Sequence, residues 1–244
     1  MDAPSRASQP HNSWAHHYDH VLDASFGPDL HRLTSSTTRL VEQLVAPPTT
    51  IVDFGAGTGR LAIPLAHAGY DVTAVDPAPA MLGQLTDKTS DVSVHTVNCP
   101  MASFRTTRRY ALGLCVFSVV THLIDWATLR ASCDAAATVL RRGGLFLIDL
   151  PNDSMFTSID IETDDLIRCV TIEPIGKSLY RYREQGILRR HGHTSRYQDT
   201  HTLRRWRRRD LTRALGQSGL TLAHDYSNEF AEWGAQYLLF RREE

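Results

Sequence analysis

The chain has 244 residues, which corresponds to one large domain or two small ones and is long enough to bury a core without disulfides or metal ions. Its residues are 42% hydrophobic and 22% charged, which excludes a disordered or collagen-like chain. With 26 Lys and Arg against 27 Asp and Glu, the net charge of -1 gives no overall attraction to nucleic acid or to a membrane surface.

The cysteines and the apolar stretches narrow the class further. The four cysteines form no Cys-x-x-Cys pair, which disfavours a structural zinc site and a disulfide framework. Residues Met1–Ser13 have no apolar core, so we expect no signal peptide. The longest apolar stretch, Ala111–Val120, has about half the length that spans a bilayer. We therefore expect a soluble, cytoplasmic protein without membrane contact.

The first 150 residues alternate between helix and strand patterns after a helical start. Apolar residues at helical spacing over Trp14–Val45 predict two helices, broken near Gly27-Pro28 and closed by Pro47-Pro48. The next strands are predicted at Ile51–Phe54, Asp71–Val75, Val92–Val97, Tyr110–Phe117 and Leu145–Leu150, the last one after a turn at residues 141–144. Helices are predicted between them at Arg60–Ala68, Ala78–Leu85 and Ala127–Leu140. Strands separated by single helices indicate a parallel sheet.

The pattern changes after Pro151. Three β segments, divided by glycines and without room for a crossover helix, are predicted to be antiparallel; they are Leu166–Ile172, Leu179–Leu188 and Thr194–Leu203. A helix at Asp210–Ser218, ended by Gly219, precedes two further strands at Leu220–His224 and Ala235–Arg241.

These elements predict an α/β protein with one Rossmann-like domain over residues 1–244 that carries a three-stranded antiparallel insertion. Within it we distinguish an N-terminal helical cap (14–46), a cofactor-binding core (49–150), the β insertion (160–205) and a final helix with two strands (208–242). No internal repeat is evident.

A glycine-rich segment lies in the turn between the first strand and the next helix. Gly55, Gly57 and Gly59 let the backbone approach a ligand closely and adopt positive φ. A dinucleotide fold needs a glycine at the position that Arg60 occupies, and the acid Asp53 at the strand end also departs from that pattern. No Lys-Ser/Thr follows, which excludes a phosphate-binding P-loop.

Asp76 ends the second predicted strand, 17 residues after Gly59. That distance is typical of the acid that accepts hydrogen bonds from both ribose hydroxyls of a nucleoside ligand. The alternative is a turn or helix-capping residue before Pro77. We favour the ribose role because the glycine loop is adjacent, and we expect Asp76 on a surface loop.

The segments VDFGAGTGRLAIPLA and VTAVDPAPAML resemble the class I S-adenosylmethionine-dependent methyltransferases, and most closely their small-molecule branch of glycine N-methyltransferase-like and amino-sugar N-methyltransferase-like enzymes. The resemblance is strong over residues 50–150, moderate over 14–45 and 206–244 and weak over 155–205. It implies S-adenosyl-L-methionine as cofactor, and a seven-stranded sheet with an antiparallel last strand.

The resemblance also implies roles for individual residues. Asp53, Gly55, Ala56 and Gly57 would line the methionine moiety, and Asp76 would hold the ribose hydroxyls. Pro77 and Met81 would flank the sugar and adenine, the backbone from Cys115 to Phe117 would meet the ligand's amino group, and the hydroxyl of Tyr18 would close over the cofactor. One position departs from the family. Pro100 stands where the family has an acid for the adenine amino group, although Met101 can still pack on adenine.

The sequence of the loop after the fourth strand indicates which kinds of acceptor atom the protein does not methylate. It reads Cys115-Val-Phe-Ser118 and lacks the Asp/Asn-Pro-Pro-Tyr of adenine-methylating enzymes. Cys99-Pro100 has the reverse order of a cytosine-C5 nucleophile and lies on another loop. Both observations disfavour DNA methylation.

His122 and Tyr18 are the candidate catalytic residues. His122 follows the fourth strand, where family members face the substrate, and an imidazole titrates near neutral pH. Its alternative is a surface histidine, and that of Tyr18 is a half-buried helix tyrosine. His16 and His20 share a helix face, but without nearby acids we expect no metal ligands.

A basic segment runs from Lys177 to Arg213, where 12 Lys and Arg are opposed by Glu184, Asp199 and Asp210. Guanidinium groups bind phosphate or carboxylate, so one interpretation is an anionic substrate. The other, which we favour slightly, is a solvated face of edge strands. Tyrosines and Trp206 among the arginines keep nucleic-acid binding as a weaker alternative.

The sequence therefore predicts an S-adenosylmethionine-dependent methyltransferase that acts on N or O of a small molecule, with a homodimer as one option for its assembly. The alternatives are an RNA methyltransferase that uses residues 177–213, and a non-catalytic S-adenosylmethionine-binding regulatory protein.

Overall fold

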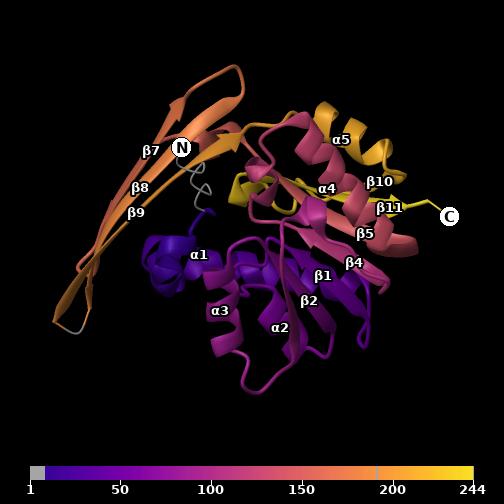
Figure 1. The fold of residues 1–244 in the computed structure, drawn as a ribbon, viewed down its shortest axis with the longest axis horizontal. Helices are drawn as coiled ribbons and strands as arrows, with labels where there is room; N and C mark the ends of the chain where they lie inside the picture. The colour runs from indigo at the N-terminus through magenta and orange to yellow at the C-terminus, as the bar shows by residue number, and fades with distance from the viewer. Residues whose placement is uncertain (1–8, 191, 244) are drawn as a thin grey trace, which may run out of the picture.

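The computed structural model describes residues 9–190 and 192–243. Two sheets and the helices around them make up the fold (Figure 1). The helices are η1 (Asn12–Trp14), α1 (Ala15–Leu44), α2 (Ala62–His67), α3 (Pro79–Asp87), η2 (Met101–Ser103), η3 (Val119–His122), α4 (Trp126–Val139), η4 (Asp153–Phe156), α5 (Arg208–Gly216) and η5 (Ala231–Trp233). The strands are β1 (Thr50–Phe54), β2 (Asp71–Asp76), β3 (Val94–Asn98), β4 (Tyr110–Cys115), β5 (Leu140–Pro151), β6 (Ile159–Glu162), β7 (Leu166–Pro174), β8 (Leu179–Arg190), β9 (His193–Arg204), β10 (Leu220–Asp225) and β11 (Ala235–Arg242).

The larger sheet has seven strands in the order β10-β11-β5-β4-β1-β2-β3. The pairs β1–β2, β2–β3, β1–β4 and β4–β5 are parallel, and β11 is antiparallel to both of its neighbours. The predicted α/β fold with an antiparallel last strand is confirmed. The strand order reverses between β1 and β4, and in such sheets ligands bind at that point, outside the carboxyl ends of the strands.

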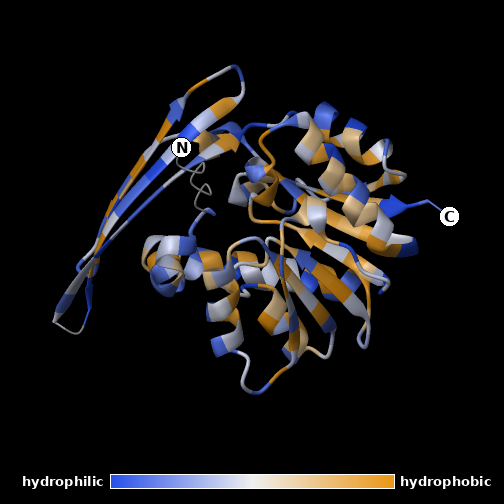
Figure 2. Cartoon of the chain, in the orientation of Figure 1, coloured by the Kyte–Doolittle hydropathy of each residue, from blue (hydrophilic) through white to orange (hydrophobic). Residues whose placement is uncertain are grey.

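The core of the larger sheet lies on both of its faces. Ile51 of β1, Leu112 of β4 and Leu147 of β5 are fully buried, and Figure 2 shows the hydrophobic colour along the strands between the covering helices. A parallel sheet is covered by helices on both sides, so its strands are near-continuous apolar runs. That is why short strands such as Ile51–Phe54 were recognisable in the sequence.

The second sheet is antiparallel and has four strands, β6-β7-β8-β9, instead of the predicted three. The missed strand β6 pairs with β7 and is mostly exposed. Ile159-Asp-Ile-Glu162 alternates apolar and acidic residues as a strand does, but a run of four residues is too short for the alternation to identify a strand by itself. In Figure 1 this sheet extends away from the larger one as a long ribbon, on the side of α1.

Three differences from the predicted elements have a clear structural cause. The fourth strand ends at Cys115, because Phe117 and Ser118 have left-handed backbone angles. The predicted turn at 141–144 lies within β5, where it bulges out between the pairs Tyr110–Leu140 and Leu112–Leu145. The two predicted N-terminal helices are the arms of α1, which kinks at Gly27 (φ 44°, ψ −125°).

Candidate functional site

A cavity of about 290 Å³ lies at the carboxyl ends of β1, β2 and β4, at the reversal of the strand order. Its wall is formed by the glycine loop, the ends of these strands and the start of α1. The predicted cofactor residues that line it are Tyr18, Asp53, Gly55, Ala56, Gly57, Asp76, Pro77, Met81, Met101 and Phe117. Cys115 does not line it: the side chain is fully buried in the core at the end of β4, and its neighbours Val116 and Phe117 reach the cavity instead.

The glycine loop is fixed by backbone hydrogen bonds to the neighbouring strand. The N–H groups of Gly55 and Ala56 donate to the carbonyl of Val75, at 2.8 and 3.2 Å. Gly55 has φ +73°, and a Cβ there would lie 2.4 Å from a methyl group of Val119. Both the backbone angle and the space therefore require glycine, and the loop backbone stays open to a ligand.

Asp76 is the buried last residue of β2, not the surface-loop residue expected from the sequence. One carboxylate oxygen accepts from the N–H of Gly57 at 2.9 Å, and the other from the N–H of Ala78 at 2.8 Å. Burial raises the pKa of Asp76, while these two hydrogen bonds oppose the shift. Because each carboxylate oxygen can accept two hydrogen bonds, both keep capacity for a pair of ligand hydroxyls.

The side chain of Asp53 lines the same cavity, but no backbone N–H group of the described residues donates a hydrogen bond to it as two do to Asp76. Its side chain is 4% exposed and accepts no hydrogen bond from the described residues. Burial raises the pKa of Asp53 to about 7, although Arg60 partly offsets the shift. A buried carboxyl without a partner is costly, and it fits a ligand that brings an ammonium group, as the methionine moiety of the predicted cofactor does.

The turn after β4 is held by Asp149, a residue that we did not predict to be part of the site. The backbone N–H groups of Phe117 and Ser118 donate to its carboxylate at 2.8 and 2.9 Å. Both donors have positive φ, a conformation that costs energy in non-glycine residues and needs support. Asp149 is 2% exposed, and burial raises its pKa to about 7. An acid within the apolar strand Leu145–Leu150 was the available signal.

A second cavity of about 510 Å³ lies between α1 and the antiparallel sheet. Much of its wall is apolar, with Phe26 and Leu30 of α1 and Val170 and Ile172 of β7 among the lining residues. Five residues line both cavities, so the two adjoin there: they are His11, Tyr18, Leu22, Phe117 and His122.

The two predicted catalytic residues, Tyr18 and His122, lie at this junction of the cavities. Burial raises the pKa of the Tyr18 hydroxyl above its usual value. Burial, together with the neighbouring His201 and His11, holds the pKa of His122 well below 6.5. At neutral pH the junction therefore offers an uncharged phenol and an uncharged imidazole.

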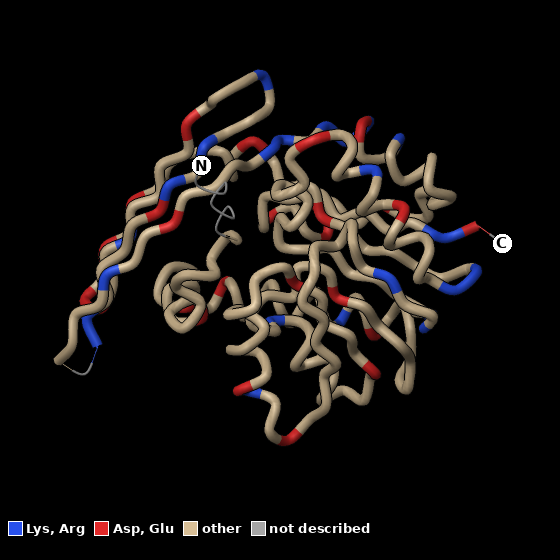
Figure 3. The backbone as a smooth tube through the Cα atoms, viewed as in Figure 1, with Lys and Arg blue, Asp and Glu red and all other residues tan. Residues whose placement is uncertain are grey.

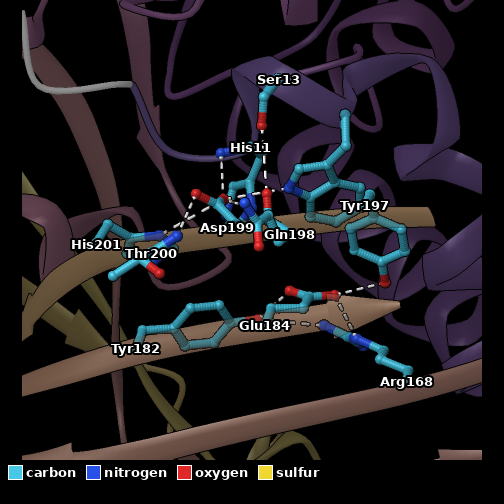
Figure 4. Close-up of polar contacts among 11 residues, drawn as sticks. His11, Ser13, Arg168, Tyr182, Glu184, Tyr197, Gln198, Asp199, Thr200 and His201 are labelled. Carbon is cyan, nitrogen blue, oxygen red and sulfur yellow. Dashed lines mark hydrogen bonds and ion pairs between the residues drawn. The ribbon is translucent and has the colours of Figure 1, made fainter. Parts of the chain in front are cut away.

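A buried polar network in the antiparallel sheet faces α1 (Figure 4). Arg168 donates to the fully buried Glu184 at 2.7 Å, and Tyr197 donates to the same carboxylate at 2.8 Å. The ring of Trp14 stacks on that of Tyr197, with centroids 4.5 Å apart. These contacts join the N-terminal segment to the sheet and so close one side of the second cavity. No local sequence pattern identifies this network, because its members come from four separate segments.

Three arginines of the basic segment, Arg181, Arg183 and Arg196, lie outside both cavity walls. On β8 and β9, alternate residues are buried, which leaves Arg181, Arg183 and Arg196 on the exposed side. None of the three lines a cavity. Figure 3 shows charges of both signs along these strands, and Arg183 pairs with Glu173 of β7 at 2.7 Å. The arrangement fits a solvated face of a sheet.

Residues 51–144 match the family model for a methyltransferase domain. Over 75 residues the chain is 33% identical to an rRNA adenine N-6-methyltransferase of Corynebacterium diphtheriae. That stretch covers 31% of this chain and 28% of the relative. None of the helices in the described ranges is both long and apolar enough to cross a membrane.

Two solved structures are similar over nearly the whole chain. An S-adenosylmethionine-dependent methyltransferase from Clostridium acetobutylicum has a TM-score of 0.79 at 18% identity, covering 96% of this chain and 99% of that one. An amino pentose methyltransferase from Micromonospora echinaspora, with S-adenosylmethionine bound, has a TM-score of 0.74 at 18% identity, covering 92% and 96%. Residues 51–144 thus belong to the methyltransferase domain family, and the whole chain has the fold of the class I S-adenosylmethionine-dependent methyltransferases.

Proposed function

We propose that the protein transfers a methyl group from S-adenosylmethionine to a nitrogen or oxygen atom of a small molecule bound in the second cavity. The main support for this proposal is that two cavities adjoin at Tyr18 and His122. One cavity has the glycine loop and two buried carboxyl groups, and the other has a largely apolar wall.

The residues of the first cavity would hold the cofactor in a defined orientation. Asp76 would accept from the ribose hydroxyls, because its carboxylate is already oriented by Gly57 and Ala78. Asp53 would pair with the ammonium group of the methionine moiety. Pro77, Met81 and Met101 would provide apolar contacts for the base. The cofactor supplies an electrophilic methyl group on a sulfonium sulfur.

The chain's own contribution at the junction would be orientation and exclusion of water. Direct transfer of this kind depends largely on holding the acceptor atom in line with the reacting bond. The neutral His122 could accept a hydrogen bond from an amine or hydroxyl and take its proton. Tyr18 would lie over the cofactor and define the edge of the acceptor's cavity.

A small-molecule acceptor is supported by the lining of the second cavity. Its wall combines apolar side chains with polar and charged groups such as Asp29, Arg32 and Arg168, which could orient a ligand, and its volume lies within the usual range of roughly 300–1,000 Å³ for small-ligand sites. The structurally similar enzyme from Micromonospora echinaspora is an amino pentose methyltransferase, which also acts on a small molecule.

An RNA methyltransferase is the second candidate, favoured by the short match to an rRNA adenine N-6-methyltransferase. It would use the exposed arginines of the antiparallel sheet. A protein that binds S-adenosylmethionine without transferring its methyl group is the third.

Transfer of a tritiated methyl group from the cofactor separates the three candidates. The protein is incubated with a low-molecular-mass metabolite extract or with bulk RNA, and the label is followed in each fraction. Our proposal predicts label in the small molecules. Label in RNA supports the second candidate, and cofactor binding without transfer to either supports the third.

A further inference from the structure

Three histidines from distant parts of the sequence converge at the junction of the two cavities. His11 precedes η1, His122 ends η3 and His201 lies on β9. One ring nitrogen from each lies within 4.8 Å of the other two. The ring centroids are 5.1 Å apart for His122 and His201, 5.2 Å for His11 and His201, and 6.1 Å for His11 and His122.

These spacings fit three imidazoles around one metal ion. Tetrahedral zinc has Zn–N distances of about 2.0–2.1 Å, which puts bound imidazole centroids about 5 Å apart and the ligand nitrogens about 3.3 Å apart. The observed distances between the ring centroids are thus close to those expected around a bound zinc ion. Small rotations of the side chains would bring the nitrogens, now within 4.8 Å, to bonding positions.

Asp199 supplies the outer partner that metal-bound histidines usually have. Its Oδ2 lies 3.2 Å from Nδ1 of His11 and 3.6 Å from Nδ1 of His201 (Figure 4). The carboxylate is buried and fixed by hydrogen bonds from the backbone N–H of His11 and the indole of Trp14. Neither Nδ1 forms a hydrogen bond as the structure stands, and a short movement toward the carboxylate would make Asp199 an outer partner, with Nε2 of both rings as the ligand atoms.

All three histidines have a buried ring nitrogen without a hydrogen-bond partner. In the described part of the chain, Nδ1 of His11, His122 and His201 is buried and forms no hydrogen bond. Burial of such an atom without a partner is unfavourable, and a metal ion would satisfy that of His122. His11 and His122 line both cavities and His201 lines the second, so a fourth coordination position would be open to a bound molecule.

We propose that His11, His122 and His201 bind one divalent transition-metal ion, with Asp199 as the outer partner. Imidazole ligands favour zinc, copper, nickel, cobalt and iron over magnesium and calcium, which prefer oxygen. With three neutral imidazoles and one nearby carboxylate, the occupied site has a net positive charge. A hydroxyl oxygen of the acceptor, which keeps a lone pair for the methyl group, would bind the open position. With metal bound, the ion would favour loss of the hydroxyl proton in place of a free His122, an interpretation that rests on the proposed function.

Cobalt(II) is the probe, because tetrahedral Co²⁺ bound to histidines absorbs visible light. The purified full-length protein is stripped with a chelator and titrated with Co²⁺, and zinc competition and metal analysis give the stoichiometry. We expect one ion per chain. His11→Asn and His201→Asn should each weaken binding by more than the roughly 10–100-fold expected for loss of an outer partner, which Asp199→Asn should show. The control is His16→Asn, an exposed histidine on α1 that should bind as the wild type does.

The thermal transition of each metal-free variant and its binding of S-adenosylhomocysteine report whether it is folded. Absence of Co²⁺ binding by the wild type, or unchanged binding in both folded ligand variants, overturns the metal site. Methyl transfer is measured separately. A protein that transfers methyl groups but binds no Co²⁺ refutes only the metal site, whereas one that binds Co²⁺ at the histidines and transfers nothing refutes only the proposed function.

Discussion

The carboxylate of Asp76 accepts a hydrogen bond of 2.9 Å from the backbone N–H of Gly57, and this contact links the end of β2 to the glycine loop. The residue proposed to bind the ribose thus also shapes the loop proposed to bind the methionine moiety. Ligand binding and loop geometry are coupled through one side chain.

Replacement of Asp76 by Ala should weaken the binding of S-adenosylhomocysteine at least tenfold. The change removes the acceptors for two ribose hydroxyls, and charge-assisted hydrogen bonds contribute roughly 1.5–3 kcal/mol each. It also leaves the buried N–H groups of Gly57 and Ala78 without acceptors, so the free energy of unfolding should fall. Calorimetry measures the affinity and urea unfolding the stability. Unchanged affinity would mean that the ribose is held elsewhere.

Asp53 should couple cofactor binding to proton release. Its pKa of about 7 in the free protein lies above the ordinary value of 3.8, and an ammonium partner should lower it again. Binding of S-adenosylhomocysteine at pH 6 should therefore release a proton, and the affinity should rise with pH until about pH 8. Calorimetry in buffers of different ionisation enthalpy measures the proton release. Asp53→Asn should release none.

The raised pKa of Asp53 also affects the stability of the free protein. The cofactor affinity should rise with pH, whereas the contribution of Asp53 to the free energy of unfolding should fall with pH. Because the folded-state pKa of Asp53 is raised, its contribution to stability is complete below the unfolded-state pKa and is lost as the pH rises through about 7. The difference in unfolding free energy between wild type and Asp53→Asn should change over this range. A constant difference would show that the Asp53 carboxyl has an ordinary pKa.

Sequence alone predicted the features that depend on neighbouring residues. The segment from Ile51 to Asp76 contains a strand, a glycine turn, a helix and a second strand, and contiguous apolar runs and glycines identify each of them. Strand β6 was missed because it is short and exposed. The division into residues 14–46, 49–150, 160–205 and 208–242 stays a prediction.

The parts of the site that sequence did not predict depend on contacts between distant segments. His11, His201 and Asp199 carry no local pattern, because η1 and β9 are adjacent only in the folded chain. Asp149 acts through the backbone of Phe117 and Ser118, more than 30 residues away. Asp76 is buried because it is the last residue of β2. The Asp-Pro pair at residues 76 and 77 is typical of a turn, so the sequence indicated a surface loop instead.

Charge reversal of the exposed basic face should leave small-molecule methylation unchanged. Arg181, Arg183 and Arg196 are exposed and line neither cavity, so their triple replacement by Glu should preserve kcat and KM. In an RNA methyltransferase the same change would weaken RNA binding and its salt dependence. A raised KM for a small acceptor would instead place these arginines in its recognition.

Loss of the His122 imidazole should lower kcat more than it raises KM. General-base removal typically costs on the order of 10²–10⁴ in rate, and Tyr18→Phe provides the comparison at the same junction. Since burial and two neighbouring histidines lower the pKa of His122, the wild-type kcat should already be at its plateau near neutral pH. Wild-type kcat profiles in both His122→Ala and His122→Asn would remove His122 from the reaction and direct attention to Tyr18.

The most direct test of the account is a crystal structure of the complex with S-adenosylhomocysteine. We predict that the product lies in the first cavity, with its ribose hydroxyls on Asp76, its amino group near Asp53 and its sulfur facing the second cavity between Tyr18 and His122. A product bound outside the first cavity, or with its sulfur turned away from that junction, would contradict it.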